Sequence, residues 1–229
     1  MNLKGNIIVI EGTDGSGKAT QTAKLRERLE NEGYEVYSTS FPNYQSDSSA
    51  AVKMYLGGQI KENANDVSAK AASMFYAVDR YITYKKELEA VINKGDKVIL
   101  FDRWVASNII HQGAKLMNEG QADEKLKEFI EWLNKIEHED FGVPKATKTI
   151  FLNVPVEYTI KLRENRLNKI TGGEKQDIHE SDTTHLKNAS KSALMAAGML
   201  GWNVIECIKD DKMRSIEDIA EEIWTTINN

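Results

Sequence analysis

The sequence predicts an α/β fold in which a five-stranded parallel sheet carries helices on both faces. Short β-branched runs alternate along the chain with longer segments of helical periodicity, which is the order of elements in β-α units. The run Ile7-Ile8-Val9-Ile10 is apolar at every position, as expected for a strand that is covered on both sides. The 229 residues contain no internal repeat and no linker-like stretch, so we expect one domain over residues 1–229.

The first β-α unit lies near the N-terminus. A strand is predicted over Asn6–Glu11, followed by a helix over Gly17–Asn31 in which Leu25 and Leu29 lie one turn apart. Gly33 is placed to end this helix, because glycine readily adopts the left-handed conformation that follows a last helical turn.

The second unit begins with a strand over Glu35–Ser40, which ends at Phe41-Pro42. A short helix is predicted over Ala50–Leu56, where two glycines follow. A long helix is predicted over Ala64–Asn93, because its apolar residues share one face and Gly95 follows its end.

The middle of the chain continues the alternation. A third strand is predicted over Lys97–Phe101 and a helix over Trp104–Met117. The acidic segment Glu119–Asp140 has apolar residues at helical spacing, and we interpret it as a solvated helix that covers the sheet and has no chemical role. A fourth strand follows over Thr149–Asn153, and Pro155 opens the next helix at a position that proline favours.

The C-terminal part contains the polar segment Asn168–Asp182, which includes two adjacent glycines and is predicted to be a loop between helices. A helix over Thr183–Met199, a last strand over Asn203–Ile208 and a closing helix over Ser215–Ile227 complete the predicted domain.

The composition excludes some classes of function. The formal net charge is −5, so the chain lacks the excess positive charge that would attract a nucleic acid polymer. No apolar stretch is long enough to cross a membrane, and the apolar run near the N-terminus is too short for an export signal. The single cysteine, Cys207, excludes an internal disulfide. We therefore expect a cytoplasmic protein without a membrane partner.

A glycine-rich segment connects the first strand to the first helix. It is predicted to bind the phosphates of ATP and consists of Gly12, Thr13, Asp14, Gly15, Ser16, Gly17, Lys18, Ala19 and Thr20. Its three glycines permit backbone angles that side chains would block, so successive N–H groups point at phosphate oxygens, and the helix adds its positive end. Lys18 supplies a mobile positive charge for the outer phosphates. A strand, a glycine-rich turn and a helix in this order predict a P-loop NTPase-like three-layer fold.

One position of this loop departs from the usual P-loop. The residue after the lysine is Ala19, where a serine or threonine hydroxyl usually binds magnesium. We expect Mg²⁺ as the cofactor that accompanies ATP, with Thr20 and Asp102 as its candidate protein ligands.

A carboxylate and an arginine follow the third strand. Since the carboxyl ends of parallel strands open onto one crevice, Asp102 is expected to face the same cleft as Lys18 and to hold magnesium through water or to orient the attacking oxygen. Arg103 offers a planar fork of donors suited to a monoester phosphate. We therefore predict that both residues are catalytic. The alternative is a structural pair that caps a helix, because aspartate is also a favoured N-cap.

These motifs resemble those of the thymidylate kinases, and the resemblance extends from about Asn6 to Cys207. The stretch from Glu11 to Gln21 resembles the P-loop of that family, whose internal aspartate binds the 3′-hydroxyl of the acceptor nucleotide, and this role falls on Asp14. Phe41-Pro42 resembles the acceptor loop after the second strand, which assigns Phe41 to the substrate site.

Two further motifs resemble the acceptor side of the family. The run from Met74 to Arg80 resembles the helix whose aromatic residue stacks on thymine and whose arginine, four residues on, contacts the base or the phosphate. By that spacing the aromatic residue is Tyr76, with Phe75 as the alternative, and the arginine is Arg80. Aromatic residues at helical spacing are, however, more often part of a core.

The run from Asp102 to Gly113 resembles the Asp-Arg-Tyr motif of the family and its Tyr-Gln follow-on. It adds four predicted substrate-binding residues, which are Arg103, Ser107, Asn108 and Gln112. Two positions depart from this pattern, because Trp104 and His111 stand where the family has tyrosines near the acceptor sugar and base. The resemblance therefore allows an altered acceptor. His111 is interpreted as a hydrogen-bonded structural histidine rather than a catalytic one.

Basic residues gather before and within the predicted loop. From Lys161 to Lys175 the chain has five basic and two acidic residues, a local excess of +3. Arg163 and Arg166 are predicted to be catalytic residues that close over the phosphates, at the start of a short basic lid at about 168–182. The P-loop itself has no arginine, so the chain resembles family members with basic lids, and Asp177-Ile178-His179-Glu180 resembles the acidic end of such a lid. The alternative is a solvated, charged helix end.

The resemblance implies a homodimeric thymidylate kinase that transfers the γ-phosphoryl group of ATP to dTMP and gives dTDP. One alternative is a deoxynucleoside kinase, or a related enzyme with an altered acceptor. Such a kinase needs a carboxylate base near the bare sugar hydroxyl, whereas Arg80 and Arg103 favour a monophosphate acceptor. A second alternative is a non-catalytic nucleotide-binding module that lost its metal through Ala19.

Overall fold

The computed structural model describes residues 2–61, 63–117, 121–163 and 183–229. Its main sheet has five strands in the order β2-β3-β1-β4-β5, and every neighbouring pair is parallel. The strands are β1 (Ile7–Gly12), β2 (Val36–Ser40), β3 (Val98–Asp102), β4 (Lys148–Asn153) and β5 (Asn203–Glu206). The five-stranded parallel sheet predicted from the sequence is thereby confirmed.

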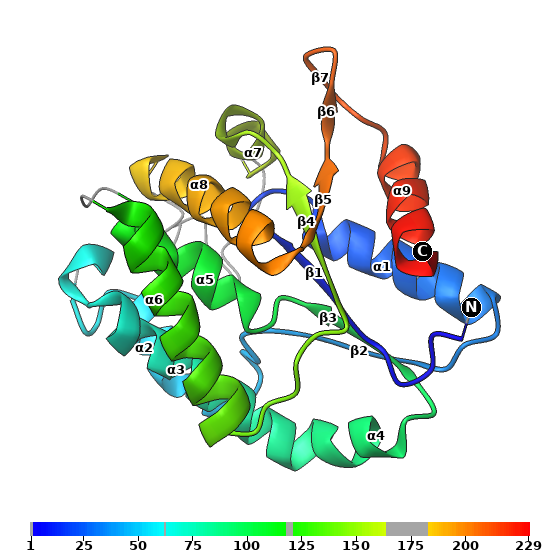
Figure 1. The fold of residues 1–229 in the computed structure, drawn as a ribbon, viewed down its shortest axis with the longest axis horizontal. Coiled ribbons are helices and arrows are strands. Elements are labelled where there is room, and N and C mark those ends of the chain that lie inside the picture. The colour runs from blue at the N-terminus through cyan, green and yellow to red at the C-terminus, as the bar shows by residue number, and fades with distance from the viewer. Residues whose placement is uncertain (1, 62, 118–120, 164–182) are drawn as a thin grey trace.

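Helices cover both faces of this sheet (Figure 1). On one face lie α1 (Lys18–Asn31) and α9 (Ile216–Asn228), and on the other lie α5 (Ala106–Gly113), α6 (Ala122–Asn134) and α8 (Thr183–Leu200). Side chains alternate along the central strand because successive residues of a strand point to opposite faces. Ile8 and Ile10 join the core under α1 and α9, whereas Ile7 and Val9 join the core on the side of α5 and α6.

The strand register places two sequence motifs next to each other. In the pairing of β1 with β3, Ile10 lies opposite Asp102, so the two strands end side by side in the middle of the sheet. The glycine-rich loop leaves β1 at this edge, and Arg103 follows β3 at the same edge. The carboxyl ends of adjacent parallel strands form the usual binding crevice of such sheets.

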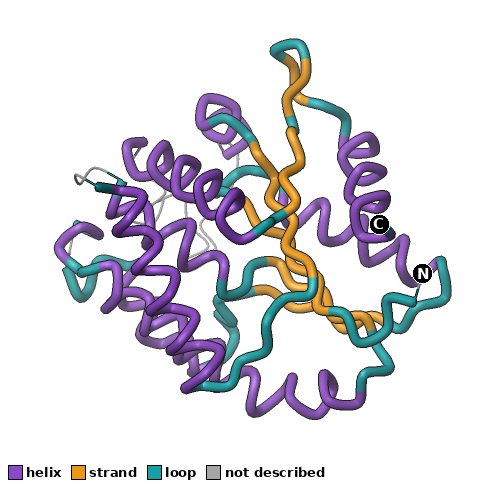
Figure 2. Tube along the Cα trace, in the orientation of Figure 1, coloured by secondary structure: helices purple, strands orange, loops and turns teal. Residues whose placement is uncertain are grey.

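The long helix predicted over 64–93 is wrong as a single element. It begins with a 3₁₀ turn (Ala64–Asp66), and continuous helical turns then form helix α3 (Ala69–Thr83), a π-helical turn (Tyr84–Leu88) and helix α4 (Glu89–Lys94). Figure 2 colours all helical segments purple. Helix α3 begins after Ser68 because the hydroxyl of that residue accepts a hydrogen bond from the Ala71 N–H at 3.2 Å.

Two further elements differ from the sequence prediction. The last strand ends at Glu206, and a small antiparallel hairpin of β6 (Ile208–Lys209) and β7 (Lys212–Met213) follows it. In the acidic segment, α6 begins only at Ala122 and passes into a π-helical segment over Lys135–Asp140.

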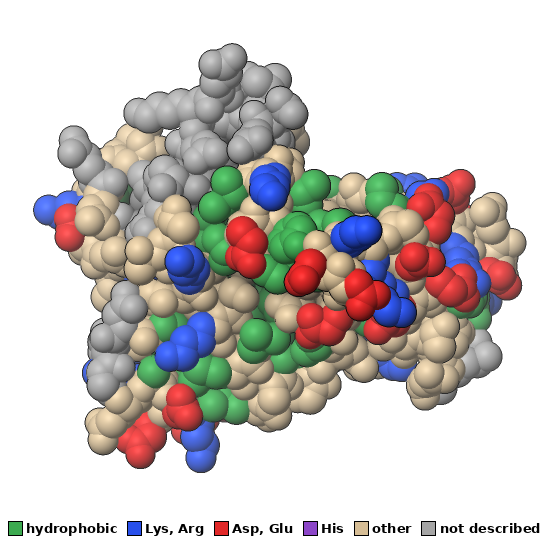
Figure 3. Space-filling view, turned by 90° about the horizontal axis from the view of Figure 1, so that it is seen from above, with side chains coloured by type: hydrophobic (Ala, Val, Ile, Leu, Met, Phe, Trp, Pro, Cys, Tyr) green, Lys and Arg blue, Asp and Glu red, His purple; other side chains and the backbone are tan. Residues whose placement is uncertain are grey.

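The other elements are helices and short turns outside the central layers. They are α2 (Ala50–Leu56), α7 (Val156–Arg163) and two 3₁₀ turns, Asp47–Ser49 and Ala114–Leu116. None of the helices in the described ranges is long and apolar enough to cross a membrane. On the face that Figure 3 shows, acidic and basic side chains are interspersed with hydrophobic ones.

Candidate active site

The P-loop forms a tight backbone turn between β1 and α1. Gly15 and Gly17 have φ values of 88° and 85°, in the left-handed region that side chains disfavour, as the sequence predicted for them. Gly12 is needed for a different reason, because a Cβ atom there would collide with the Ser16 hydroxyl and lie 3.2 Å from the Leu152 carbonyl oxygen. The loop is therefore shaped by two special backbone angles and one close approach.

Lys18, at the start of α1, turns its ammonium group back onto this loop. Its Nζ donates hydrogen bonds to the carbonyl oxygens of Gly12 at 2.9 Å and Thr13 at 2.8 Å. Burial, with the nearby positive charge of Arg103, lowers the pKa of Lys18 to about 8, although the carboxylates of Asp14 and Asp102 oppose this shift. Lys18 thus places a buried positive charge at the loop where phosphates are predicted to bind.

Arg103 joins the end of β3 to the P-loop. Its Nη2 forms an ion pair with the Asp14 carboxylate, and its Nη1 donates to Nε2 of His111 at 2.6 Å. The backbone of Arg103 has a φ of 73°, an unfavourable angle for a residue with a side chain, and such strain is often found at functional sites. The P-loop after β1, the residue that follows β3 and helix α5 therefore meet at the guanidinium group of Arg103.

His111 serves as a neutral acceptor in this cluster. Burial, together with the positive charge of Arg103, holds the pKa of His111 well below its ordinary value. The imidazole is therefore uncharged at neutral pH, with its Nε2 lone pair directed at Arg103. The interpretation of His111 as a hydrogen-bonded structural histidine agrees with this geometry.

Glu11 is a site residue that the sequence interpretation missed. Its fully buried carboxylate accepts hydrogen bonds from the Trp104 N–H at 2.8 Å and from the Ser107 hydroxyl at 2.6 Å. Burial raises the pKa of Glu11, and the hydrogen bond from Ser107 and the charge of Arg103 oppose this shift. Glu11 thereby links the strand before the P-loop to the segment after Arg103. A charged residue at the end of an otherwise apolar strand was the available signal.

The oxygen atoms at the strand ends fit a magnesium ion. Asp102 Oδ1 and the hydroxyl of Ser16 are both buried, and neither has a hydrogen-bond partner within the described part of the chain. Carboxylate and hydroxyl oxygens are the ligands that Mg²⁺ prefers, usually together with substrate phosphates. Thr20, the other candidate ligand, is exposed on α1, and so is Ala19. Asp102 thus has a buried oxygen that could bind the ion, and the assignment of Asp102 and Thr20 as ligands stays a prediction.

Residues 10–206 of the chain match the family model described as thymidylate kinase. The chain belongs to the thymidylate kinase family.

Related proteins agree with this assignment over nearly the full length. A Pyrococcus abyssi protein named "Probable thymidylate kinase" is 29% identical, and the alignment covers 99% of this chain and 98% of that protein. The thymidylate kinase of Mycobacterium tuberculosis is 28% identical over 86% of this chain and 87% of its own length. Among solved structures, thymidylate kinase from Candida albicans superposes with a TM-score of 0.70 at 19% identity and covers all of this chain and 93% of that one. This likeness shows that the fold is shared.

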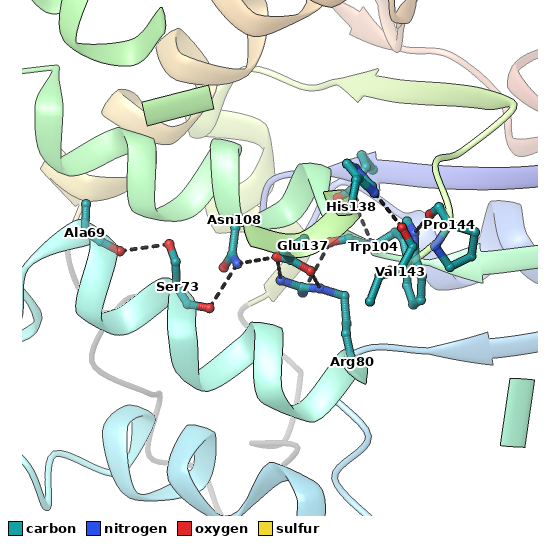
Figure 4. Close-up of polar contacts among 10 residues, drawn as sticks. Ala69, Ser73, Arg80, Trp104, Asn108, Glu137, His138, Val143 and Pro144 are labelled. Carbon is teal, nitrogen blue, oxygen red and sulfur yellow. Dashed lines mark hydrogen bonds and ion pairs between the residues drawn. The ribbon is translucent and has the colours of Figure 1, made fainter. Parts of the chain in front are cut away.

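The resemblance to the thymidylate kinases predicts that Arg80 contacts the base or the phosphate of the acceptor nucleotide. In the structure, Arg80 belongs to a different cluster from Asp14 and Arg103. The side chain of Arg80 is only 2% exposed and forms an ion pair with Glu137, which is fully buried (Figure 4). Its Nε donates to Glu137 Oε2 at 2.7 Å, and its Nη1 lies 3.5 Å from the Trp104 carbonyl oxygen. A shared phosphate grip by Arg80 and Arg103 is therefore not supported, because Glu137 holds Arg80 in a different cluster.

Phe41 and Trp104 both lie in the hydrophobic core of this thymidylate kinase family member. Phe41 packs against Phe101 and Trp104, with ring centroids 5.8 and 4.9 Å apart, and is buried. Its assignment to the substrate site is not supported, because its ring fills the core beneath the site. Trp104 is also buried, and its indole N–H donates to the Pro144 carbonyl oxygen at 3.0 Å. Replacement of the family tyrosine by Trp104 is thus accommodated by packing.

The remaining acceptor-side residues lie on α3 and α5. Tyr76 is half-buried, and its ring meets that of Tyr55 edge-on at 6.4 Å. Asn108 is buried and bonded to Glu137, whereas Ser107 is bonded to Glu11. Gln112 is buried, and neither of its amide atoms has a hydrogen-bond partner among the described residues.

The predicted lid falls largely outside the described ranges. Helix α7 ends at Arg163, whose side chain is not described, and Arg166 with the loop at about 168–182 lies in the undescribed part. The roles of both arginines stay predictions.

Proposed function

We propose that the chain transfers the γ-phosphoryl group of ATP to the 5′-phosphate of dTMP, which gives ADP and dTDP. The observation that carries this proposal is the convergence of Lys18, Asp14 and Arg103 where β1 and β3 end side by side. A lysine-bearing P-loop suits a donor triphosphate, and an arginine at its edge suits a monoester phosphate. This combination favours a monophosphate kinase within the family.

The donor half of the reaction is assigned to the P-loop. Its backbone N–H groups and the N-terminus of α1 bind the β- and γ-phosphates, and Lys18 moves from the carbonyls of Gly12 and Thr13 to the phosphate oxygens. Asp102, with its unpaired carboxylate oxygen, would hold Mg²⁺ together with those oxygens. The ion, when bound, neutralises charge on the transferring group.

The acceptor half is assigned to the residues around Arg103. Its guanidinium binds the dTMP phosphate and aligns one phosphate oxygen with the γ-phosphorus of ATP. Asp14 accepts a hydrogen bond from the 3′-hydroxyl of the sugar, and Tyr76 lies against the base. The predicted lid arginines, Arg163 and Arg166, close over the phosphates and exclude water, which would otherwise accept the phosphoryl group.

The experiment that tests this proposal is an acceptor panel. With ATP and Mg²⁺, we expect the highest kcat/KM with dTMP among dTMP, dUMP, dGMP and thymidine. Turnover of thymidine without turnover of dTMP would assign the chain to the deoxynucleoside kinases. ATP binding without turnover of any acceptor, with or without Mg²⁺, would indicate a nucleotide-binding module.

The lid arginines need a separate test. Arg166→Ala is expected to lower kcat by about 10³-fold or more, which is the range for an arginine that stabilises a transferring phosphoryl group. Lys161→Ala is the control, because Lys161 is exposed on α7 and lies over the Tyr158 ring at 5.8 Å. Equal kcat values for both variants would remove the lid from the mechanism.

We also propose that the chain acts as a homodimer in the cytoplasm, where its substrates are found. Val78 on α3 and Leu194 on α8 are exposed hydrophobic side chains, and each is a candidate for burial in an interface. Light scattering during gel filtration should give twice the 25.8 kDa of the chain, and a mass of one chain would contradict the dimer.

A further inference from the structure

The backbone conformation of Arg103 is unusual for a residue that carries a side chain. Its φ of 73° lies in the left-handed region, which glycine adopts readily and other residues adopt only with strain. A strained conformation of this kind persists only where the surrounding structure holds it in place. The contacts of the backbone around Arg103 should therefore show what holds it.

Two hydrogen bonds from strand β1 fix the peptide groups on either side of Arg103. The Arg103 N–H donates to the carbonyl oxygen of Ile10 at 3.1 Å. The N–H of the next residue, Trp104, donates to Oε1 of Glu11 at 2.8 Å. Because each peptide group is planar, the φ and ψ angles of Arg103 are the only rotations between these two groups. Strand β1 thus determines both angles, one through a backbone carbonyl and the other through a side chain.

Glu11 is the part of this arrangement that depends on a side chain. Its carboxylate is fully buried, and its second oxygen, Oε2, accepts a hydrogen bond from the Ser107 hydroxyl at 2.6 Å. A buried carboxylate is costly unless it is hydrogen-bonded, so these two donors explain how it is tolerated at the end of an apolar strand. They also fix the carboxylate in one orientation, with Oε1 directed at the Trp104 N–H.

The conformation of Arg103 determines where its guanidinium group lies. The side chain reaches from the end of β3 to the P-loop and to α5, where Nη2 pairs with Asp14 and Nη1 donates to Nε2 of His111 at 2.6 Å. His111 lies one helical turn after Ser107 on α5. Glu11 therefore holds both the backbone of Arg103 and the helix that carries an acceptor for its guanidinium group.

We propose that Glu11 is a positioning residue for Arg103: its carboxylate holds the Arg103 backbone in the left-handed conformation and thereby directs the guanidinium group toward the phosphate of the acceptor nucleotide. This inference rests on the proposed function, which assigns that phosphate to Arg103. Glu11 acts through the Trp104 N–H and contacts no nucleotide. What it must supply is a hydrogen-bond acceptor at the right distance, and its negative charge is secondary.

The first test measures the backbone strain at position 103 and needs no substrate. With Glu11 present, Arg103→Gly should unfold at a temperature about 2–4 °C higher than Arg103→Ala, because glycine relieves the left-handed strain. In the Glu11→Leu background, residue 103 can adopt a right-handed conformation. The advantage of glycine should then vanish or change sign, because glycine also adds conformational freedom to the unfolded chain. Thermal unfolding of the four proteins measures both differences.

Asp210 provides the matched control for this comparison. It is exposed, it lies between β6 and β7, and its φ of 51° is also left-handed. The difference between Asp210→Gly and Asp210→Ala should be the same with and without Glu11. A glycine advantage at position 103 that persists in Glu11→Leu would overturn the inference. If Glu11→Leu does not fold, Glu11→Asp takes its place, because its shorter side chain ends further from the Trp104 N–H.

The second test separates the reach of the Glu11 side chain from its charge. Glu11→Gln keeps an oxygen that can accept from the Trp104 N–H, and the Ser107 hydroxyl can accept from the new NH₂ group. Glu11→Asp keeps the charge but loses the reach. We expect kcat/KM for dTMP to fall about 100-fold in Glu11→Asp, the loss typical of a misplaced group, and far less in Glu11→Gln. The KM for ATP in Glu11→Asp should change less than kcat/KM for dTMP.

The order of the two variants decides between positioning and charge. A simple counter-ion for Arg103 would make Glu11→Gln the poorer enzyme, and this reverse order would overturn the inference. Equal kcat/KM values for dTMP in the two variants would overturn it as well.

Failure of this inference can be told apart from failure of the proposed function. The proposed function fails if the unaltered protein does not phosphorylate dTMP at all, and the unfolding comparison would then still show whether Glu11 holds the backbone of Arg103. The inference fails if the protein phosphorylates dTMP but the advantage of glycine at position 103 does not depend on Glu11.

Discussion

At the scale of single residues, the main feature of the site is that several of its charged side chains are buried. Lys18 is buried against two backbone carbonyls, and Glu11 is buried against Trp104 and Ser107. Burial disfavours the charged form of each group, which lowers the pKa of Lys18 and raises that of Glu11. Such opposed shifts in one cleft are typical of functional sites.

The pKa of Lys18 predicts how ATP binding depends on pH. Bound phosphates would raise this pKa above about 8, so binding is coupled to uptake of a proton once the pH exceeds that value. The Kd for ATP should therefore be constant below about pH 7.5 and should rise up to about tenfold per pH unit above pH 8. Isothermal titration calorimetry measures this directly. Lys18→Ala should bind weakly at every pH, and an equally steep pH dependence in that variant would assign it to another group.

His111 gives a second prediction at this scale. His111→Phe removes the acceptor for Arg103 Nη1 and leaves a partly buried charged donor without a partner. We expect the KM for dTMP to rise about tenfold, which corresponds to about 1.4 kcal/mol. Steady-state kinetics should show a smaller rise for His111→Gln, because its amide oxygen still accepts. Since the pKa of His111 is lowered, its titration should not produce an inflection near pH 6.5.

Sequence patterns predicted the P-loop residues but not the partner of Arg80. The glycine spacing and Lys18 can be recognised because their chemistry is local to one turn. Glu137 is one of eight acidic residues between Glu119 and Asp140, and only packing against α3 shows that it is buried. A signal was present, since Glu137 continues the helical stripe of Leu126, Ile130 and Leu133.

At the scale of elements, the strands and the long helices α1, α8 and α9 were predicted within two residues of their observed bounds, whereas the π-helical turn between α3 and α4 was not predicted. The first strand was predicted one residue early, and helix α2 was predicted at its observed bounds. The π-helical turn at Tyr84–Leu88 interrupts a segment whose apolar pattern is continuous, so periodicity alone gives no sign of it. The early end of β5 depends on pairing with β4, which a local pattern does not contain.

The two ends of α1 offer a matched test of the P-loop conformation. Gly17 and Gly33 have φ values of 85° and 84°, and an added Cβ would contact nothing at either position. Gly17→Ala and Gly33→Ala should each lower the free energy of unfolding by about 1–2 kcal/mol, the strain of a left-handed alanine. Denaturant unfolding measures this cost. ATP affinity should fall only in Gly17→Ala, and an equal loss in Gly33→Ala would contradict a local phosphate grip.

At the scale of the whole molecule, the two helical layers have different tasks. The layer of α3, α5 and α6 carries the acceptor-side residues, whereas α9 packs on α1 behind the sheet. Arg28 of α1 pairs with Glu221 of α9 at 2.5 Å and lies over the Trp224 ring at 4.4 Å. Alternation of apolar runs and helical segments was enough to predict these layers. The sequence did not reveal which helix covers which face, because that depends on strand order.

Substitutions in the layer of α1 and α9 should therefore change the stability of the protein without changing its acceptor specificity. Ile223→Ala removes a side chain that is 1% exposed in the core under α9, and it should cost about 2–5 kcal/mol. Ile216→Ala, on the same helix at 45% exposure, should change stability by less than about 0.5 kcal/mol. Thermal unfolding compares the two. At 25 °C both folded variants should keep the preference for dTMP over dUMP and dGMP, and a changed preference in Ile223→Ala would show that the layers are coupled.

The bridge made by Glu11 has a consequence for inhibitor design. Because one carboxylate ties the strand that leads into the P-loop to the segment that follows Arg103, we expect the spacing between the two proposed nucleotide positions to be fixed already in the free protein. A single rigid molecule that joins an adenosine to a thymidine through a linker of matching length would then require little rearrangement of this part of the protein. Only a narrow range of linker lengths should accordingly give tight binding, and adding or removing one phosphate unit should weaken binding sharply.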